Sequence, residues 1–182
     1  MLDKYLVVIL WAMTLAVTCL TISSIAYVLT GDRWPEYKIS PLYYWDFSGY
    51  SEFHVSAADW RAAPVRPDPL QHPKDPEYAY FYIHQVNVEE GWSGVTVIKS
   101  ENGVILTADV YLNSYWFDGW GSGARRSTCA HEIGHVLGLN EEPDVTLRAL
   151  MYPYHNIRWD IWRINTPQND DVEGVNAIYG AP

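Results

Sequence analysis

The sequence has few cysteines and few basic residues for its length. Only Cys19 and Cys129 occur in 182 residues, and Cys19 falls in an apolar N-terminal stretch, so we expect no internal disulfide in the folded part. Cys129 is expected to be a small buried apolar residue. Lysine and arginine number 12 against 22 acidic residues, which gives a net charge of −10. Because a nucleic-acid-binding protein needs a basic surface, we expect no nucleic-acid partner.

Internal repeats and low-complexity tracts are also absent, which argues for a single folded unit. Hydrophobic residues make up 48% of the sequence and argue against global disorder. Without the apolar N-terminal stretch about 150 residues remain, which is enough for one compact domain with its own core.

The N-terminal stretch from 5 to 29 contains no charged residue. A helix that rises about 1.5 Å per residue crosses a hydrocarbon core of about 30 Å over this length. We therefore predict a transmembrane anchor over 1–30, a linker over 31–37 and a folded domain over 38–182. A cleaved signal peptide is the alternative, because Ser24-Ile25-Ala26 places small residues where a signal peptidase reads them. Either reading places the domain outside the cytoplasm.

Periodicity and turn residues divide the remaining chain into short elements. Strands are predicted over 38–47, 78–88, 95–99 and 104–113, with a hairpin turn at Glu101-Asn102-Gly103. Helices are predicted over 51–63, from near Ser127, and over 169–179. Loops are predicted at 64–76, which is rich in proline, and at 115–123, which is rich in aromatic residues and glycine.

The stretch from His131 to Glu141 carries the clearest chemical signal. On a helix, His131 and His135 project from the same face, so both imidazoles can bind one metal ion. Glu132 can act as a general base on a metal-bound water without being a ligand. Gly138 permits a positive φ that ends the helix and turns the chain back, which brings Glu141 to the same ion. Three ligands and a vacant fourth position are the arrangement of a catalytic zinc site.

Glu141 ranks first as the third ligand, and three nearby residues are the alternatives: Glu142, Asp144 and His155. A set of two histidines and one glutamate is a known catalytic zinc arrangement. The carboxylate charge should make the zinc a weaker Lewis acid than three imidazoles would. Three other histidines lack a compact ligand spacing and are expected to be surface or packed residues: His54, His72 and His84.

These motifs together resemble the metzincin zinc proteases, and the matrixin branch in particular. The stretch from His131 follows the pattern His-Glu-x-x-His-x-x-Gly-x-x-His/Asp, except that glutamate stands at the third ligand position. Residues 149–153 resemble the Met-turn of that family, which implies that Met151 lies beneath the zinc. Residues 170–180 are similar to its final helix, and 103–113 to the strand that leads to the active-site helix.

The resemblance implies an α+β fold of the metzincin (zincin-like) class. It consists of a twisted, mixed five-stranded sheet, an active-site helix, a Met-turn and a C-terminal helix. A substrate peptide would pair with an edge strand to which residues 95–100 contribute. The resemblance also implies that Pro153 and Tyr154, which follow the Met-turn, line the main specificity pocket; ordinary packing is the alternative for both. It does not extend securely to residues 31–94.

The predicted function is therefore that of a Zn²⁺-dependent endopeptidase, in which Glu132 is the general base and the partner is a polypeptide substrate. We expect a monomer that is attached to the membrane through its N-terminal segment. The alternative is an inactive, metal-binding peptide- or protein-recognition module on the cell surface, which the unusual Glu141 suggests. A membrane-anchored adhesive domain without metal is a third reading, based on the aromatic residues 115–120. We see no room for a cysteine-bearing prosegment between residue 31 and the domain, so we expect no cysteine-switch latency.

Overall fold

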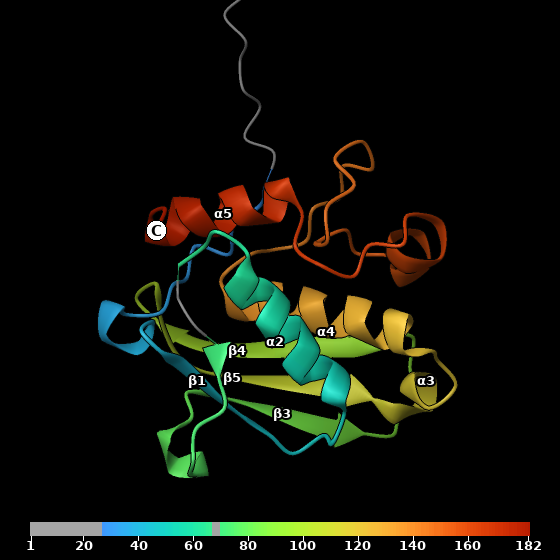
Figure 1. Ribbon diagram of the computed structural model, residues 1–182, viewed down its shortest axis with the longest axis horizontal. Coiled ribbons are helices and arrows are strands. Elements are labelled where there is room, and N and C mark those ends of the chain that lie inside the picture. The colour runs from blue at the N-terminus through green and yellow to red at the C-terminus, as the bar shows by residue number, and fades with distance from the viewer. Residues whose placement is uncertain (1–26, 67–69) are drawn as a thin grey trace, which may run out of the picture.

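The computed structural model describes residues 27–66 and 70–182. These residues form a sheet with several helices packed on it (Figure 1). The elements in chain order are η1 (Glu36–Lys38), β1 (Leu42–Asp46), α2 (Ser51–Ala62), β2 (Leu70–Gln71), η2 (Pro76–Tyr78), β3 (Phe81–Val86), β4 (Gly94–Glu101), β5 (Val104–Asn113), α3 (Ser114–Phe117), α4 (Ser122–Val136), η3 (Asn156–Ile161) and α5 (Asn169–Tyr179).

The sheet has the strand order β2-β1-β3-β5-β4. Strands β1, β3 and β5 run parallel, and β4 runs antiparallel to β5, so the predicted mixed α+β fold is confirmed. The residue pattern predicted four strands, and the resemblance implied a five-stranded sheet. The structure has four strands of five or more residues, and β2 adds only a two-residue pair beside β1. Strand β4 lies at the edge of the sheet, which leaves one of its sides open to a partner.

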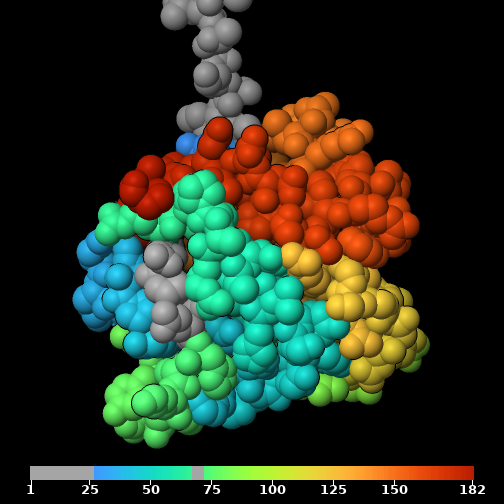
Figure 2. Space-filling view, in the orientation of Figure 1, coloured from blue at the N-terminus to red at the C-terminus, as the bar shows by residue number. Residues whose placement is uncertain are grey.

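The core lies between the sheet and helices α2 and α4, which Figure 1 shows on one face of the sheet. In β5 the buried side chains include Ile105, Val110 and Leu112. Helix α2 is tied to α4 by the Trp60 indole, which donates to the Ala130 carbonyl at 2.9 Å. On the face shown in Figure 2, the C-terminal residues (orange and red) lie against the α2 segment. Cys129 is fully buried as expected, and burial raises the pKa of its thiol.

The predicted hairpin is confirmed, but helix α4 begins earlier than the sequence indicated. The hairpin turn has Asn102 at φ 53° and Gly103 at φ 79°. Helix α4 begins at Ser122 rather than near Ser127. An arginine in the first turns of a helix opposes the macrodipole. Tertiary contacts offset this, because Arg126 makes hydrogen bonds of 2.6 and 2.8 Å to Asp59 on α2.

The predicted anchor over 1–30 lies outside the described residues except for 27–30. Within 27–66 and 70–182, no helix combines the length and the apolar character needed to cross a membrane. Residues 27–30 are not helical. Thr30 N donates to the Gly138 carbonyl at 3.0 Å, and Asn140 N donates to the Val28 carbonyl at 2.8 Å. The end of the predicted leader is therefore hydrogen-bonded to the chain that precedes Glu141.

The segment 31–37, which we predicted as a linker, contributes to the core. Trp34 is fully buried, and its indole donates to the Val136 carbonyl at 2.8 Å. That carbonyl lies at the C-terminal end of α4, where helix carbonyls lack intrahelical partners. This hydrogen bond joins residues 102 positions apart, a pairing that local sequence pattern does not reveal.

Candidate metal centre

The two histidines on α4 present unprotonated nitrogens to one point. His131 Nε2 and His135 Nε2 lie 3.2 Å apart. His131 Nδ1 lies 2.9 Å from the Leu150 carbonyl, and His135 Nδ1 lies 3.0 Å from the Leu139 carbonyl. Because a carbonyl only accepts, we assign the proton of each neutral ring to Nδ1. Both Nε2 atoms then carry lone pairs, as metal-binding histidines do.

Glu141 completes the group after a reversal of the chain at Gly138. Gly138 has φ 95°, and a Cβ there would lie 2.7 Å from the Asp32 carbonyl oxygen, so glycine is required on both counts. Glu141 Oε1 lies 3.5 Å from His131 Nε2 and 3.6 Å from His135 Nε2. When both imidazoles are neutral and protonated on Nδ1, their Nε2 atoms and Glu141 Oε1 are all acceptors, and no proton lies between them.

These distances fit a tetrahedral zinc ion. Ligand bonds of about 2.0–2.1 Å at tetrahedral angles separate neighbouring ligand atoms by about 3.3–3.4 Å. The three separations observed are 3.2, 3.5 and 3.6 Å. Glu141 Oε2 is buried and has no hydrogen-bond partner among the described residues. Two imidazoles and a carboxylate suit zinc, so the residues present fit the metal that the resemblance implies.

The electrostatics also favour a cation at this point. Burial raises the pKa of Glu141, but contacts with His131 and His135 outweigh it and hold that pKa well below its ordinary value. Burial and the charge of Arg158 lower the pKa of His131. For His135, burial lowers the pKa, yet contacts with Glu141 and Glu132 raise it above the ordinary value. The anionic carboxylate and the neutral His131 are the forms that bind a metal.

The three alternative ligands are engaged elsewhere. Glu142 Oε1 accepts from Asp144 N at 2.9 Å. Asp144 Oδ1 in turn caps the next turn of chain by accepting from Thr146 N at 2.8 Å. The ring of His155 stacks on an indole 4.0 Å away. Within the part of the chain that the structure describes, one group of three ligating side chains has its donor atoms within 4.8 Å: His131, His135 and Glu141.

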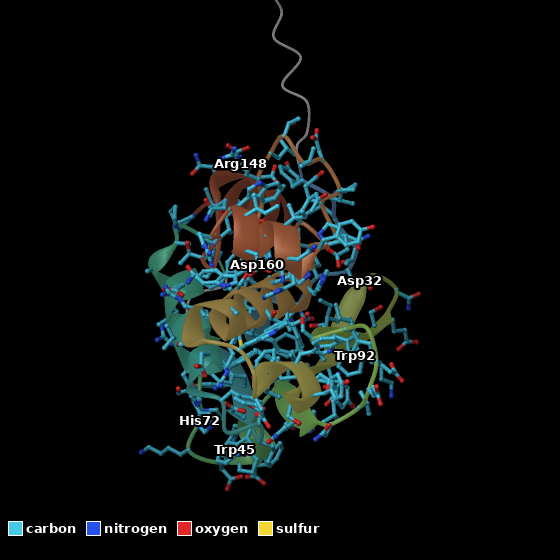
Figure 3. All side chains as sticks on the ribbon, turned by 90° about the vertical axis from the view of Figure 1, so that its right-hand side faces the viewer. Asp32, Trp45, His72, Trp92, Arg148 and Asp160 are labelled. Carbon is cyan, nitrogen blue, oxygen red and sulfur yellow. The ribbon has the colours of Figure 1, made fainter. Side chains whose placement is uncertain are left out.

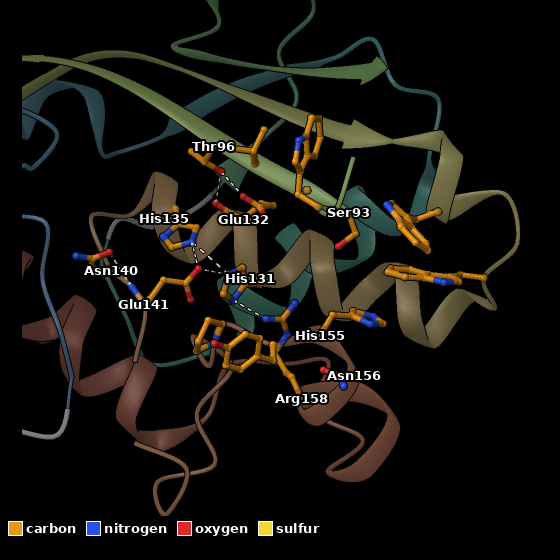
Figure 4. A pocket seen from close by; sticks show the side chains of 18 of the residues that line it. Ser93, Thr96, His131, Glu132, His135, Asn140, Glu141, His155, Asn156 and Arg158 are labelled. Atoms are coloured by element: carbon orange, nitrogen blue, oxygen red, sulfur yellow. Dashed lines mark hydrogen bonds and ion pairs between the residues drawn. The ribbon is translucent and has the colours of Figure 1, made fainter. Parts of the chain in front are cut away.

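Glu132 lies beside this group and is held by the edge strand. It is 4% exposed, and Thr96 on β4 donates from its hydroxyl to Glu132 Oε2 at 2.7 Å. A Cβ at Gly94 would lie 2.7 Å from Glu132 Oε1, so the backbone of β4 approaches the carboxylate closely. Figure 4 shows Glu132 between α4 and β4, apart from the three converging side chains. This position suits a base that acts on a neighbouring water.

The turn at Met151 packs against helix α4 and helps to orient His131. Met151 is 2% exposed and lies against Gly134 on α4. Asp171 on α5 accepts from Leu150 N at 2.9 Å and from Met151 N at 3.0 Å. The same turn supplies the Leu150 carbonyl that orients His131. Asp171 thus anchors this turn to α5.

A cleft of about 790 Å³ opens over the candidate centre. Pro153 and Tyr154 both line it, and Tyr154 is 64% exposed, so neither is a packed core residue. Of the aromatic segment, Trp116 and Trp120 also line the cleft, whereas Phe117 is fully buried in the core. The segment therefore contributes both to the cleft and to the core.

Arg158 is a residue of the cleft that the sequence did not single out. It comes from η3 and is only 2% exposed. Its Nη1 donates to the Tyr152 carbonyl at 2.6 Å and lies 3.0 Å from His131 Nδ1. Guanidinium only donates, so that second approach is a contact between neighbours. Burial lowers the pKa of Arg158 to about 10, which leaves it charged at neutral pH.

The remaining histidines are surface or packed residues, as expected. His84 Nε2 lies 2.9 Å from an oxygen of Asp109. The ring of His72 lies 4.5 Å from that of Trp45, and Figure 3 shows both at the end of the molecule opposite Arg148.

Comparison with known proteins finds similarity in the C-terminal part of the chain. The sequence model of the Matrixin family (peptidase M10) matches residues 118–180, about a third of the chain. Stromelysin-1 of Rattus norvegicus is 43% identical over 53 residues, 29% of this chain and 10% of its own length. Metalloendoproteinase 1 of Glycine max is 44% identical over 54 residues, 30% of this chain and 16% of its own length. The chain thus matches only a small part of these relatives.

A solved structure has a similar fold over most of this chain. The GM1-bound form of the ECX AB5 holotoxin superposes with a TM-score of 0.57 over 84% of this chain and 86% of that chain, at 12% identity. Such low identity supports the fold alone. The chain therefore has a mixed α+β fold that fits a matrixin-like domain. Its residues 118–180, which carry His131 to Glu141 and the turn at Met151, are similar in sequence to the matrixins.

Proposed function

We propose that this protein is a zinc-dependent endopeptidase that cleaves polypeptides in the cleft beside β4. One observation carries the proposal: three ligand atoms meet at tetrahedral spacings, with the carboxylate of Glu132 beside them on the wall of an open cleft. A zinc ion held by His131, His135 and Glu141 would supply Lewis-acid activation of the substrate carbonyl and of a water molecule.

The chain's own residues supply the remaining steps. Glu132, held by Thr96, takes a proton from the attacking water and passes it to the leaving amine. The outer side of β4 offers backbone groups to an extended peptide, because β4 pairs with β5 on its other side. Exposed Val95 and Val97 on β4 lie where such a peptide would run. Pro153 and Tyr154 line the same cleft, where they would contact substrate side chains.

Cleavage of an unstructured protein and of a peptide library tests the proposal. The wild type should cleave, and Glu132→Ala should lose about 10²- to 10⁴-fold in rate while still binding zinc. Glu101→Ala, which changes an exposed glutamate at the end of the same strand β4, is the matched control and should keep full activity. Equal cleavage by wild type and Glu132→Ala would end the proposal.

A non-catalytic recognition module is the second candidate function. Glu141 favours it, because glutamate stands where the matrixin signature has histidine or aspartate. Stoichiometric zinc and peptide binding without turnover on any peptide of the library would support this candidate over the first.

The apolar stretch from 5 to 29 supports a proposed placement outside the cytoplasm, with the N-terminal segment as anchor. N-terminal sequencing of the protein from a membrane fraction tests it. An intact N-terminus is expected for an anchor, and a start just after Ala26 would indicate a cleaved signal peptide instead.

A further inference from the structure

Arg158 is a buried cation in the cleft that neither the metal centre nor the proposed base requires. Its Nε donates to the Ser127 hydroxyl at 3.1 Å, and its Nη1 donates to the Tyr152 carbonyl at 2.6 Å. Both acceptors are neutral. Its Nη2 has no hydrogen-bond acceptor in the described part of the chain. Because Arg158 lines the same cleft as His131, this unused donor belongs to a wall of the substrate site.

No carboxylate of the described residues forms an ion pair with Arg158. Three carboxylates act on it from a longer distance, those of Glu132, Glu141 and Asp171. Each has other partners: Glu132 accepts from Thr96, Glu141 faces the two imidazoles, and Asp171 accepts from backbone N–H groups. A buried guanidinium without a counter-ion is costly, so a fold that keeps one in a cleft indicates a ligand that supplies the missing charge.

We propose that Arg158 is a specificity-determining residue that binds the side-chain carboxylate of a substrate aspartate or glutamate adjacent to the scissile bond. This inference rests on the proposed function. The position follows from geometry, since Nη1 lies 3.0 Å from the ring of His131, whose far nitrogen faces the metal position. When the scissile bond lies at the metal position, the side chain of an adjacent substrate residue is long enough to reach the guanidinium. The unused Nη2 can donate a charge-assisted hydrogen bond to such a carboxylate.

Matched pairs of peptides test this preference in the full-length protein. Each pair is acetylated and amidated at its ends and differs only as Glu against Gln, or Asp against Asn, on either side of the cleaved bond. The acidic member should have a kcat/KM about 10- to 100-fold higher, the range for a hydrogen bond to a charged group. The C-terminal carboxylate of a peptide is the other source of the group that Arg158 would bind. Peptides with a free C-terminus are therefore compared with the blocked ones. A preference that follows only the terminus would overturn the side-chain assignment.

Arg158→Gln should abolish the preference, mainly by raising KM for the acidic peptides. Arg163→Gln is the control, because it removes an equal charge from an exposed residue that follows η3 and does not line the cleft. Should Arg158 serve only to support the fold, Arg158→Gln would lower kcat/KM equally for both members of a pair. Equal cleavage of acidic and amide peptides by the wild type also overturns the inference, and this holds even if Arg158→Gln does not fold.

Peptide binding separates this inference from the proposed function. Glu132→Gln should bind labelled acidic peptides more tightly than their amides, which fluorescence anisotropy measures without cleavage. If peptides are cleaved without acidic preference, only the role of Arg158 fails. If no peptide is cleaved or bound, the endopeptidase proposal and this inference both fail.

Discussion

Replacement of Glu141 by alanine should weaken zinc binding without unfolding the protein. The side chain is 42% exposed, so its removal leaves no sealed cavity in the core. Its Oε1 has two neighbours, the imidazole nitrogens at 3.5 and 3.6 Å, and its Oε2 has no partner among the described residues. The substitution therefore acts almost entirely on the metal site.

The expected magnitude follows from the number of ligands. Structural zinc sites with four protein ligands bind with about 10–16 kcal/mol, so one ligand contributes about 3 kcal/mol. Loss of the carboxylate should then raise the zinc dissociation constant about 100-fold. Glu141→His, which restores the signature residue, should recover most of this affinity, whereas Glu141→Gln keeps the shape and loses the charge.

Competition with a chromophoric chelator near neutral pH measures these affinities, and circular dichroism checks the fold of each variant. Asp144→Ala is the matched control, since Asp144 lies close in sequence and caps a turn rather than facing the imidazoles. Unchanged zinc affinity in Glu141→Ala, together with a loss in Asp144→Ala, would refute the assignment of the third ligand.

Three further predictions follow from buried polar contacts. Gly94→Ala places a Cβ 2.7 Å from Glu132 Oε1, so kcat should fall about 10- to 100-fold with zinc content unchanged; a loss of zinc would contradict this. Asp171→Ala leaves the N–H groups of Leu150 and Met151 without an acceptor and should cost about 2–4 kcal/mol in urea unfolding. Burial, then the charge of Asp171, raises the pKa of Asp170 to about 6, so the folded state favours its protonated form. The wild type should therefore lose stability as pH rises from about 4 through 6, and Asp170→Asn should be about 1 kcal/mol more stable at pH 8 with no advantage below pH 4. Melting curves across this range would contradict the reasoning if the difference stayed constant.

Local pattern predicted the parts of this protein that local geometry controls. Two histidines four residues apart share a helix face whatever surrounds them, and Gly138 does have the positive φ that turns the chain. Asn102 and Gly103 form the predicted hairpin turn, because only such residues accept its dihedral angles cheaply. Helix α2, which was predicted over 51–63, is present at Ser51–Ala62.

Tertiary structure decided what depends on residues far apart in the chain. Glu141, Glu142, Asp144 and His155 were all candidates for one role, and only the path of the folded chain brings Glu141 to the imidazoles. The hydrogen bond from Thr96 to Glu132 spans 36 residues of sequence, and no periodicity encodes it.

The sequence by itself therefore determined which chemical groups are present and which of them share a helix face, since covalent spacing and backbone dihedrals act over a few residues. The folded structure alone decided that Trp34 belongs to the core, that Asp171 holds the turn at Met151, and that Arg158 is buried in the cleft without an ionic partner among the described residues. These outcomes arise from burial and pairing across the chain, where the free energy of one side chain depends on neighbours that the sequence does not place beside it.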